Sequence, residues 1–274
     1  MRPLVTDNSN KTKVGLQVEF MDERILTLEG NDNPATNKWQ SISHRLVAAL
    51  KPYGPPIGIS FLSEDAVSPV GRCEDEDPEP NEYGRTGQVP AGCVFWIRAA
   101  DASFTTTASD HANCSVGSLT HGFLTLEEAA TKDDVGAVLE SGWVNEAAIS
   151  QLPVVKDKPG AIVYGPLENN VTDPDVVLLR INGLALMTLK DAIPDLQIEG
   201  KPQCHIIAIA KEQGKVAVSV GCALSRSRTG MRPEEMTCAI PTGQLETLLD
   251  RLQSTVTLNR AMASYASADA SRFQ

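Results

Sequence analysis

The sequence predicts an α/β or α+β fold, a single layered domain in which helices pack against a mixed sheet. Two observations predict it: apolar runs of strand length alternate with segments of helical periodicity, and a cysteine-bearing pattern occurs twice. The repetition predicts two pseudo-symmetric halves, about 37–150 and 160–255, with a C-terminal helix completing the domain (37–274). Residues 1–36 are expected to form a loose arm with one edge strand at 13–20.

The first half opens with a helix and a strand. Residues 39–50 carry apolar side chains at helical spacing, which leaves His44 on the solvent side. The prolines within 52–56 end this helix because proline cannot continue it, and the apolar run 57–62 predicts a buried strand. The connection 63–92 is long, and its acidic run is interpreted as a solvated loop, with a lid or a cation-attracting rim as the alternative.

The remaining elements alternate between helix and strand. Thr125, with Glu128 three residues on, resembles a capping box that opens one or two helices. Apolar runs predict the strands and amphipathic runs the helices, and the tail to Gln274 is able to extend the last helix. In chain order these are a strand within 153–170, a strand at 176–181, a helix at 182–193, a strand at 236–241 and a helix at 242–256.

The repeated pattern contains two cysteines in each half. Each unit has a cysteine, a short amphipathic segment, a strand-like run, a second cysteine, seven residues, a glycine and then Phe123 or Met231. The cysteines are Cys93 and Cys114 in the first unit and Cys204 and Cys222 in the second. The pattern therefore indicates where a site lies as well as how the chain folds.

Composition excludes several classes of function. A net charge of −11 without a basic face argues against nucleic-acid binding. No run approaches the roughly 18 apolar residues of a membrane helix, and the N-terminus lacks a secretory signal, so we expect a soluble, cytoplasmic, acidic protein. Its six cysteines are then expected to be reduced. The CxxC pair, the Gly-rich dinucleotide motif, the Walker loop, GxSxG and HExxH are all absent.

Cys114 and Cys222 are the leading candidates for chemistry. Each follows a strand-like run and precedes a glycine-containing turn, so each is expected at a strand end, where α/β proteins place ligands. A helix beginning after that turn would favour the thiolate, which attacks electrophiles or binds metals. The alternative is that both are small buried hydrophobes, and Cys93 and Cys204 fit that packing role better.

Two histidines lie near the first of these cysteines. His111 precedes Cys114 by three residues and His121 follows it by seven. Imidazole and thiolate together suit a transition metal, or a nucleophile with its base. We therefore expect Cys114, Cys222 and His111 as candidate metal ligands, with iron, zinc or haem as the cofactor. The alternative is that His111 and His121 lie in solvent-exposed loops. His205 lies in an apolar run and is expected in the core.

The second unit carries arginines where the first carries histidines. Arg226 and Arg228 follow Cys222, and guanidinium groups bind carboxylates or phosphates bidentately. Both are candidates for binding an anionic substrate. Surface pairing with Glu234 and Glu235 is the alternative.

The sequence also resembles a known family. The run VSVGCALSRSRTGMRPEEMTCAIP, followed by an amphipathic helix, resembles the end of the uncharacterised family known as domain of unknown function 169. The opening run KWQSISHRLVAALKPYGPPIGISFL and the segment 93–122 resemble its beginning and its middle cysteine segment. The resemblance spans roughly 37–255, and it implies a cysteine-containing α/β or α+β body without a settled activity.

Together these features predict an enzyme that acts on a small, anionic or electrophilic molecule. Cys114 and Cys222 would be thiolate nucleophiles or metal ligands, and His111 or His121 the base or co-ligand. The alternative is a non-catalytic sensor or carrier that binds a metal or cofactor through the same residues. A catalytic metal keeps an open coordination position and a structural one does not, so the number of protein ligands separates the two hypotheses. The sequence leaves open whether the chain forms a homo-oligomer.

Overall fold

The computed structural model describes residues 34–73, 91–229 and 231–270. The part of the chain that follows residue 32 forms one compact unit. The predicted edge strand and most of the predicted arm lie outside the described residues, as does the acidic run that was interpreted as a loop or a lid. None of the described helices is both long and apolar enough to cross a membrane.

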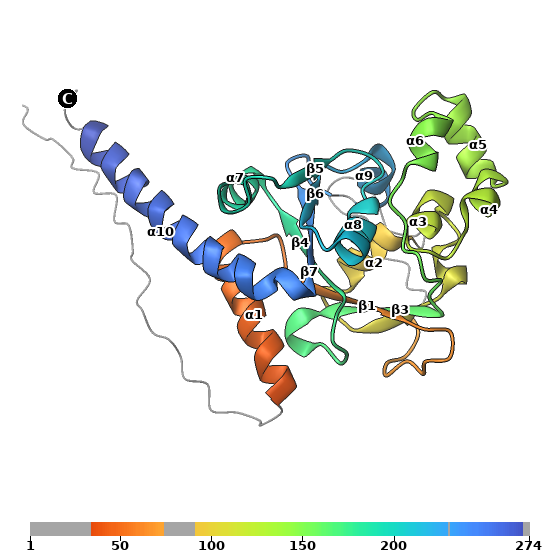
Figure 1. The fold of residues 1–274 in the computed structure, drawn as a ribbon, viewed down its shortest axis with the longest axis horizontal. Helices are drawn as coiled ribbons and strands as arrows, with labels where there is room; N and C mark the ends of the chain where they lie inside the picture. The colour runs from red at the N-terminus through yellow and green to blue at the C-terminus, as the bar shows by residue number, and fades with distance from the viewer. Residues whose placement is uncertain (1–33, 74–90, 230, 271–274) are drawn as a thin grey trace, which may run out of the picture. The chain divides into compact units, whose positions relative to one another are not determined.

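A seven-stranded mixed sheet forms the centre of the fold (Figure 1). The strand order is β2-β3-β1-β4-β7-β6-β5, and every pair is antiparallel except β5 with β6. The strands are β1 (Ile57–Leu62), β2 (Phe104–Thr106), β3 (Ala161–Pro166), β4 (Val176–Ile181), β5 (Gln197–Glu199), β6 (Ala217–Ser219) and β7 (Met236–Pro241). The strands predicted at 57–62, 176–181 and 236–241 are therefore confirmed, and so is the α/β class.

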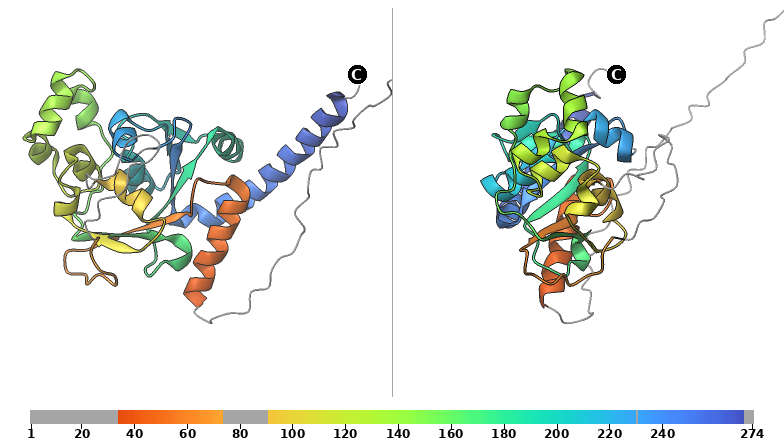
Figure 2. Two further views of the ribbon diagram at one scale, coloured as in Figure 1. Left: turned by 180° about the vertical axis from the view of Figure 1, so that it is seen from behind. Right: turned by 90° about the vertical axis from the view of Figure 1, so that its right-hand side faces the viewer.

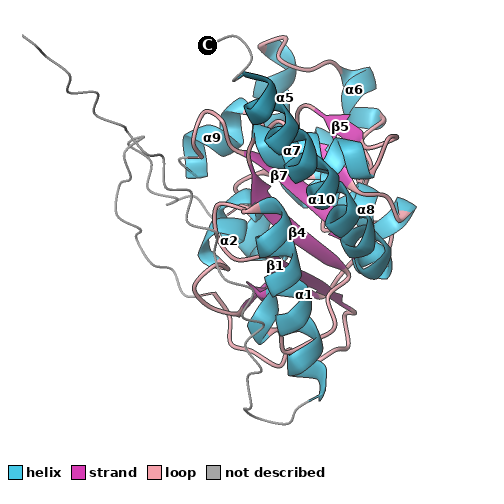
Figure 3. Ribbon diagram, turned by 90° about the vertical axis from the view of Figure 1, so that its left-hand side faces the viewer, coloured by secondary structure: helices cyan, strands magenta, loops and turns pink. Residues whose placement is uncertain are grey.

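Helices cover both faces of the sheet. They are α1 (Pro34–Leu50), α2 (Gly92–Arg98), α3 (Ser115–Thr120), α4 (Leu126–Ala130), α5 (Asp133–Glu140), α6 (Glu146–Ser150), α7 (Gly183–Ala192), α8 (His205–Gln213), α9 (Ala223–Thr229) and α10 (Leu245–Ala270). Figure 3 shows α1, α7 and α10 over one face. On the other face α2 and α8 pack against the sheet. Side chains on both faces of the central strands are therefore buried.

Strand β4 shows why a continuous apolar run was expected to be buried. Val177, Leu179 and Ile181 belong to the core beneath α1, α7 and α10, whereas Val176 and Leu178 belong to the core beneath α2 and α8. Side chains of a strand point alternately to its two faces, so only a strand covered on both sides buries consecutive residues. Burying each such side chain contributes about 1.5–3 kcal/mol.

Four short helices, α3 to α6, gather on one side of the sheet and share a small core of their own (Figure 2). The predicted capping box at Thr125 is present, because its hydroxyl accepts a hydrogen bond from the Glu128 backbone N–H at 3.2 Å. These helices connect β2 to β3, which are neighbours in the sheet. Cys114 is the N-cap residue of α3, the first of these helices.

The two predicted halves do not occupy separate sides of the sheet. The half 37–150 contributes β1 and β2, whereas the half 160–255 contributes β3 to β7, and β3 lies between β2 and β1. Each cysteine unit contains a helix, a short strand and a second short helix, in that order. Helices α4 to α6 and strand β5 break the match between the halves. The pseudo-symmetry therefore stays a prediction.

Candidate thiol site

Four thiols, two from each cysteine unit, line one small cavity. Cys93 lies in the first turn of α2, Cys114 is the N-cap residue of α3, Cys204 is the N-cap residue of α8, and Cys222 immediately precedes α9. The cavity between them measures about 30 Å³. This is room for about two water molecules, and organic ligands need several hundred Å³. All six cysteines lie in the described residues, and none of them forms a disulfide there.

Two of the four thiols are buried and two reach the mouth of the cavity. Cys93 and Cys204 are buried, whereas Cys114 and Cys222 are partly exposed. Burial, together with the neighbouring sulfurs of Cys114 and Cys222, raises the pKa of Cys93 to about 12. The pKa of Cys204 is raised well above its usual value by burial, with the same neighbours contributing. The inner pair is therefore protonated at neutral pH unless a cation compensates the thiolates.

The loop around Cys222 directs its sulfur through local hydrogen bonds. The backbone N–H of Ser225 donates to Cys222 Sγ at 3.3 Å, and Ser225 Oγ donates to the carboxamide oxygen of Gln203. Gln203 in turn donates to Thr237 Oγ1 of β7 at 3.0 Å. An N–H donor to sulfur stabilises the thiolate relative to the thiol. This chain of contacts therefore ties a candidate ligand to the central sheet.

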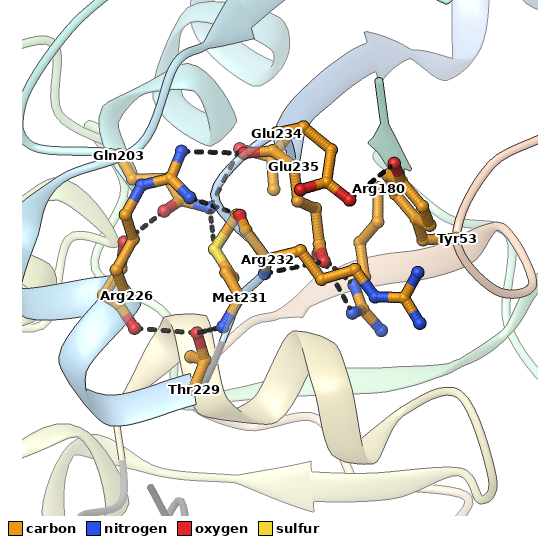
Figure 4. A network of polar contacts seen from close by, with 11 residues as sticks. Tyr53, Arg180, Gln203, Arg226, Thr229, Met231, Arg232, Glu234 and Glu235 are labelled. Atoms are coloured by element: carbon orange, nitrogen blue, oxygen red, sulfur yellow. Dashed lines mark hydrogen bonds and ion pairs between the residues drawn. The ribbon is translucent and has the colours of Figure 1, made fainter. Parts of the chain in front are cut away.

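Arg226 holds the same loop from the other side (Figure 4). Its guanidinium donates to the carbonyl oxygens of Val220 at 2.8 Å, Glu235 at 2.8 Å and Arg232 at 2.5 Å. Gly221 adopts φ +91°, and a Cβ at that position would lie 3.2 Å from the guanidinium. Glycine allows both the backbone conformation and the close approach.

The guanidinium of Arg226 is directed at backbone carbonyls, so it is placed to position Cys222. Binding of an anionic substrate by Arg226 stays a prediction. The alternative was that the arginines pair with Glu234 and Glu235 at the surface. The carboxylate of Glu235 is instead buried and pairs with Arg180 at 2.5 Å and 3.1 Å. Glu234 accepts a hydrogen bond from the Tyr53 hydroxyl at 3.3 Å (Figure 4).

Arg228 lies at the cavity itself. It lines the space between the thiols and donates to the backbone carbonyl oxygen of Asn113, next to Cys114, at 3.0 Å. Burial by itself lowers the pKa of Arg228, but the nearby sulfur of Cys114 and those of two other cysteines raise it, and the net shift is upward. A guanidinium beside thiols stabilises thiolates and attracts anions. Of the two predicted arginines, Arg228 is the one that lines the thiol cavity, and its role in substrate binding stays a prediction.

His111 lies in the aromatic core instead of at the thiols. Its ring is fully buried, with ring centroids 5.0 Å from Phe95 and 4.9 Å from Phe123. Nε2 lies 3.0 Å from Thr106 Oγ1, and burial holds the pKa of His111 well below its usual value. His111 is not among the residues that line the cavity. The structure therefore does not bring His111 to Cys114 and Cys222 as the expected third ligand.

His121 lies behind the cavity wall. Nδ1 lies 2.7 Å from the carbonyl oxygen of Gly117, which only accepts hydrogen bonds, so Nδ1 carries the proton. A Cβ on Gly92 would lie 2.8 Å from the imidazole, and both Gly92 and Gly117 line the thiol cavity. Burial lowers the pKa of His121 to about 4, so the ring is neutral at physiological pH. A neutral imidazole whose other nitrogen donates to a carbonyl is the usual state of a metal-binding histidine.

The comparison with protein families identifies the relatives of this chain. The sequence profile of domain of unknown function 169, described as "Uncharacterised ArCR, COG2043", matches residues 45–251. The chain belongs to the DUF169 family. This confirms the resemblance that the cysteine segments indicated. Neither the curated proteins nor the solved structures gave a match to this DUF169 chain.

Sequence reasoning assigned Cys93 and Cys204 to packing, yet they line the cavity of this DUF169 protein together with the other two thiols. The repeated unit was the signal that pointed to them, because it contains a cysteine at both of its ends.

In the described parts of the chain no group of three or more His, Cys, Asp or Glu side chains is arranged to hold a metal ion. Binding of one ion by the thiols therefore needs their side chains to rotate about χ1 onto a common centre.

Proposed function

We propose that this protein binds a thiolate-ligated metal centre, a zinc or iron ion or a small iron–sulfur cluster, and uses it on a small anionic molecule. The observation that supports the proposal is the convergence of Cys93, Cys114, Cys204 and Cys222 on one small cavity. Four thiolates are the ligand set of zinc and of iron–sulfur clusters. The volume of about 30 Å³ suits an ion far better than haem, which the sequence analysis had kept among the cofactors.

The charge balance of the site supports the same proposal. Raised pKa values at Cys93 and Cys204 mean that their thiolates are disfavoured without a compensating cation. A divalent cation removes this penalty, and metal binding then releases the thiol protons. Arg228 supplies a further positive charge beside Cys114. Partial exposure of Cys114 and Cys222 gives a small molecule access to that side of the centre.

A non-catalytic carrier or sensor is the second candidate, and the presence of four thiols favours it. Four cysteines complete a tetrahedral coordination sphere, and closed sites of this kind are structural or transfer electrons. A catalytic ion would leave one of the four thiols unbound. Ligation of the metal by three or by four cysteines therefore decides between the two candidates.

Anaerobic purification, followed by elemental analysis and an absorption spectrum, tests the proposal. The metal content should be stoichiometric in the wild type and should fall in each of the variants Cys93→Ser, Cys114→Ser, Cys204→Ser and Cys222→Ser. Cys238→Ala is the control, because Cys238 is buried in the core on the opposite face of the sheet. A variant that keeps its metal identifies an unbound thiol and favours the enzyme. A wild type that cannot be loaded with zinc or iron refutes the metal centre, and alkylation rates against pH would then measure thiol reactivity.

A further inference from the structure

A second, larger cleft adjoins the thiol cavity. It measures about 580 Å³, within the range of small-molecule sites. Trp143 lines both spaces, and Lys201 lines the cleft while Pro202, the next residue, lines the thiol cavity. The thiol cavity by itself is too small for an organic molecule. A substrate that reaches the thiols from this side would therefore have most of its atoms in the adjoining cleft.

The cleft combines an apolar wall with a positioned cation. Trp143, Leu139 and Val144 supply the apolar surface. Lys201 Nζ lies 4.4 Å from the centre of the Trp143 ring and donates a hydrogen bond to the Trp143 carbonyl oxygen. An ammonium group has three N–H donors, so two remain for a ligand. Because these contacts already restrict the lysine, binding an anion costs less side-chain entropy than at an unrestrained surface lysine.

The charges around the two spaces favour an anion. Lys201 lines the cleft and Arg228 lines the thiol cavity, so each of the two spaces that Trp143 lines has one cation. Glu146 is the one acidic residue among those that line the two spaces. The protein as a whole has a net charge of −11, so a site with more positive than negative residues differs from its average surface. Flat rings pack well against an indole face.

We propose that this cleft binds a planar organic anion, an aromatic or heteroaromatic carboxylate, as the substrate of the thiol centre. That the anion is a substrate rests on the proposed function, because it needs the thiol centre. That the cleft binds the anion does not depend on the proposed function. The ring lies against Trp143 and the apolar wall, the carboxylate pairs with Lys201, and the opposite end of the molecule points toward Cys114 and Arg228.

Benzoate tests the proposal, with benzamide as its neutral analogue of the same shape. Trp39 and Trp96 are buried, so Trp143 is the one partly exposed tryptophan of the three and its emission reports on the cleft. Benzoate should change that emission saturably, and benzamide should bind at least about fivefold more weakly, the loss expected for one partly exposed charge interaction. Equilibrium dialysis on the same samples measures binding without relying on fluorescence.

Two lysine variants separate a specific cleft from general charge attraction. Lys201→Gln should weaken benzoate binding about fivefold, whereas Lys215→Gln should leave it unchanged, because Lys215 is exposed and lines a different cavity. Trp143→Leu should weaken binding in dialysis by a similar factor. Circular dichroism confirms that each variant is folded.

Several results would overturn the proposal. These are equal binding of benzoate and benzamide, an unaffected Lys201→Gln variant, or no saturable binding up to roughly 10 mM. Metal content is measured on the same preparations. Benzoate binding without metal therefore refutes the proposed function alone, and metal without benzoate binding refutes the cleft alone.

Discussion

Replacing Arg226 tests how the site is positioned. In Arg226→Ala three backbone carbonyls lose a charged donor, those of Val220, Arg232 and Glu235. A hydrogen bond from a charged donor contributes about 1.5–3 kcal/mol, but the side chain is partly exposed and water replaces part of each bond. We therefore expect the free energy of unfolding to fall by about 2–3 kcal/mol. Lysine keeps the charge but cannot reach three carbonyls at once, so Arg226→Lys should recover less than half of this loss.

The same variants should also change metal binding, because Val220 and Gly221 lead directly into Cys222. Residues that orient a ligand typically contribute 10–100-fold to metal affinity, so we expect a loss of about tenfold or more in Arg226→Ala. Urea unfolding of the metal-free protein gives the stability, and competition with a chelator gives the affinity. Arg260→Ala, at an exposed position of α10, should stay within about 0.5 kcal/mol of the wild type. If Arg226→Ala matches that control in both measurements, the positioning role is refuted.

Three further predictions concern stability. The pKa of His121 is about 4 in the folded protein and about 6.5 in the unfolded chain, so the unfolded chain takes up a proton first as the pH drops. The free energy of unfolding should therefore fall by up to about 3 kcal/mol between pH 6.5 and pH 4. Urea midpoints against pH measure this, and the fall should shrink in His121→Gln but not in His44→Gln, where the ring is exposed. Arg180→Met should lower the free energy of unfolding by about 3 kcal/mol, because it leaves the fully buried carboxylate of Glu235 without its cation. Adding Glu235→Leu should recover part of this loss. A double variant that is no more stable than Arg180→Met would contradict the prediction. Gly221→Ala should destabilise the protein by about 1–3 kcal/mol, because φ is +91° at that position. Gly136→Ala in α5 has open space around it and should stabilise the protein by about 0.5–1 kcal/mol. Equal thermal midpoints for the two variants would refute the backbone argument.

Local patterns predicted elements better than they predicted roles. The strands β1, β4 and β7 were predicted at their observed bounds because a strand buried on both faces is a continuous apolar run. The helix predicted at 182–193 matches α7 nearly to the residue, and the structure shows that Asn182 caps it by accepting from the Ala185 N–H at 3.0 Å. The run 102–109 was expected to be strand-like, and only Phe104–Thr106 pair with β3. Pairing depends on the neighbouring strand, which a local pattern does not contain.

Residue roles depended on contacts that no spacing reveals. Arg226 and Arg228 are two residues apart on the same short helix, yet one holds backbone carbonyls and the other faces the thiols. Successive side chains on a helix point in different directions, so neighbours in sequence meet different surroundings. His111 and His121 were expected beside Cys114 because they lie near it in sequence, and both rings are instead buried behind or beyond the cavity wall.

The sequence by itself determined the positions of the main strands and helices, the family, and the repeated pairing of cysteines. Each of these is a property of periodicity or motif within a short stretch of chain. Only the tertiary structure decided that all four thiols of the two units line one cavity. The two units are separated by more than eighty residues, from Cys114 to Cys204. They meet because β1 of the first half pairs with β3 and β4 of the second in one sheet, and because α2 contacts α9 and α3 contacts α8. Long-range strand pairing and helix packing set that geometry, and local sequence patterns do not encode it.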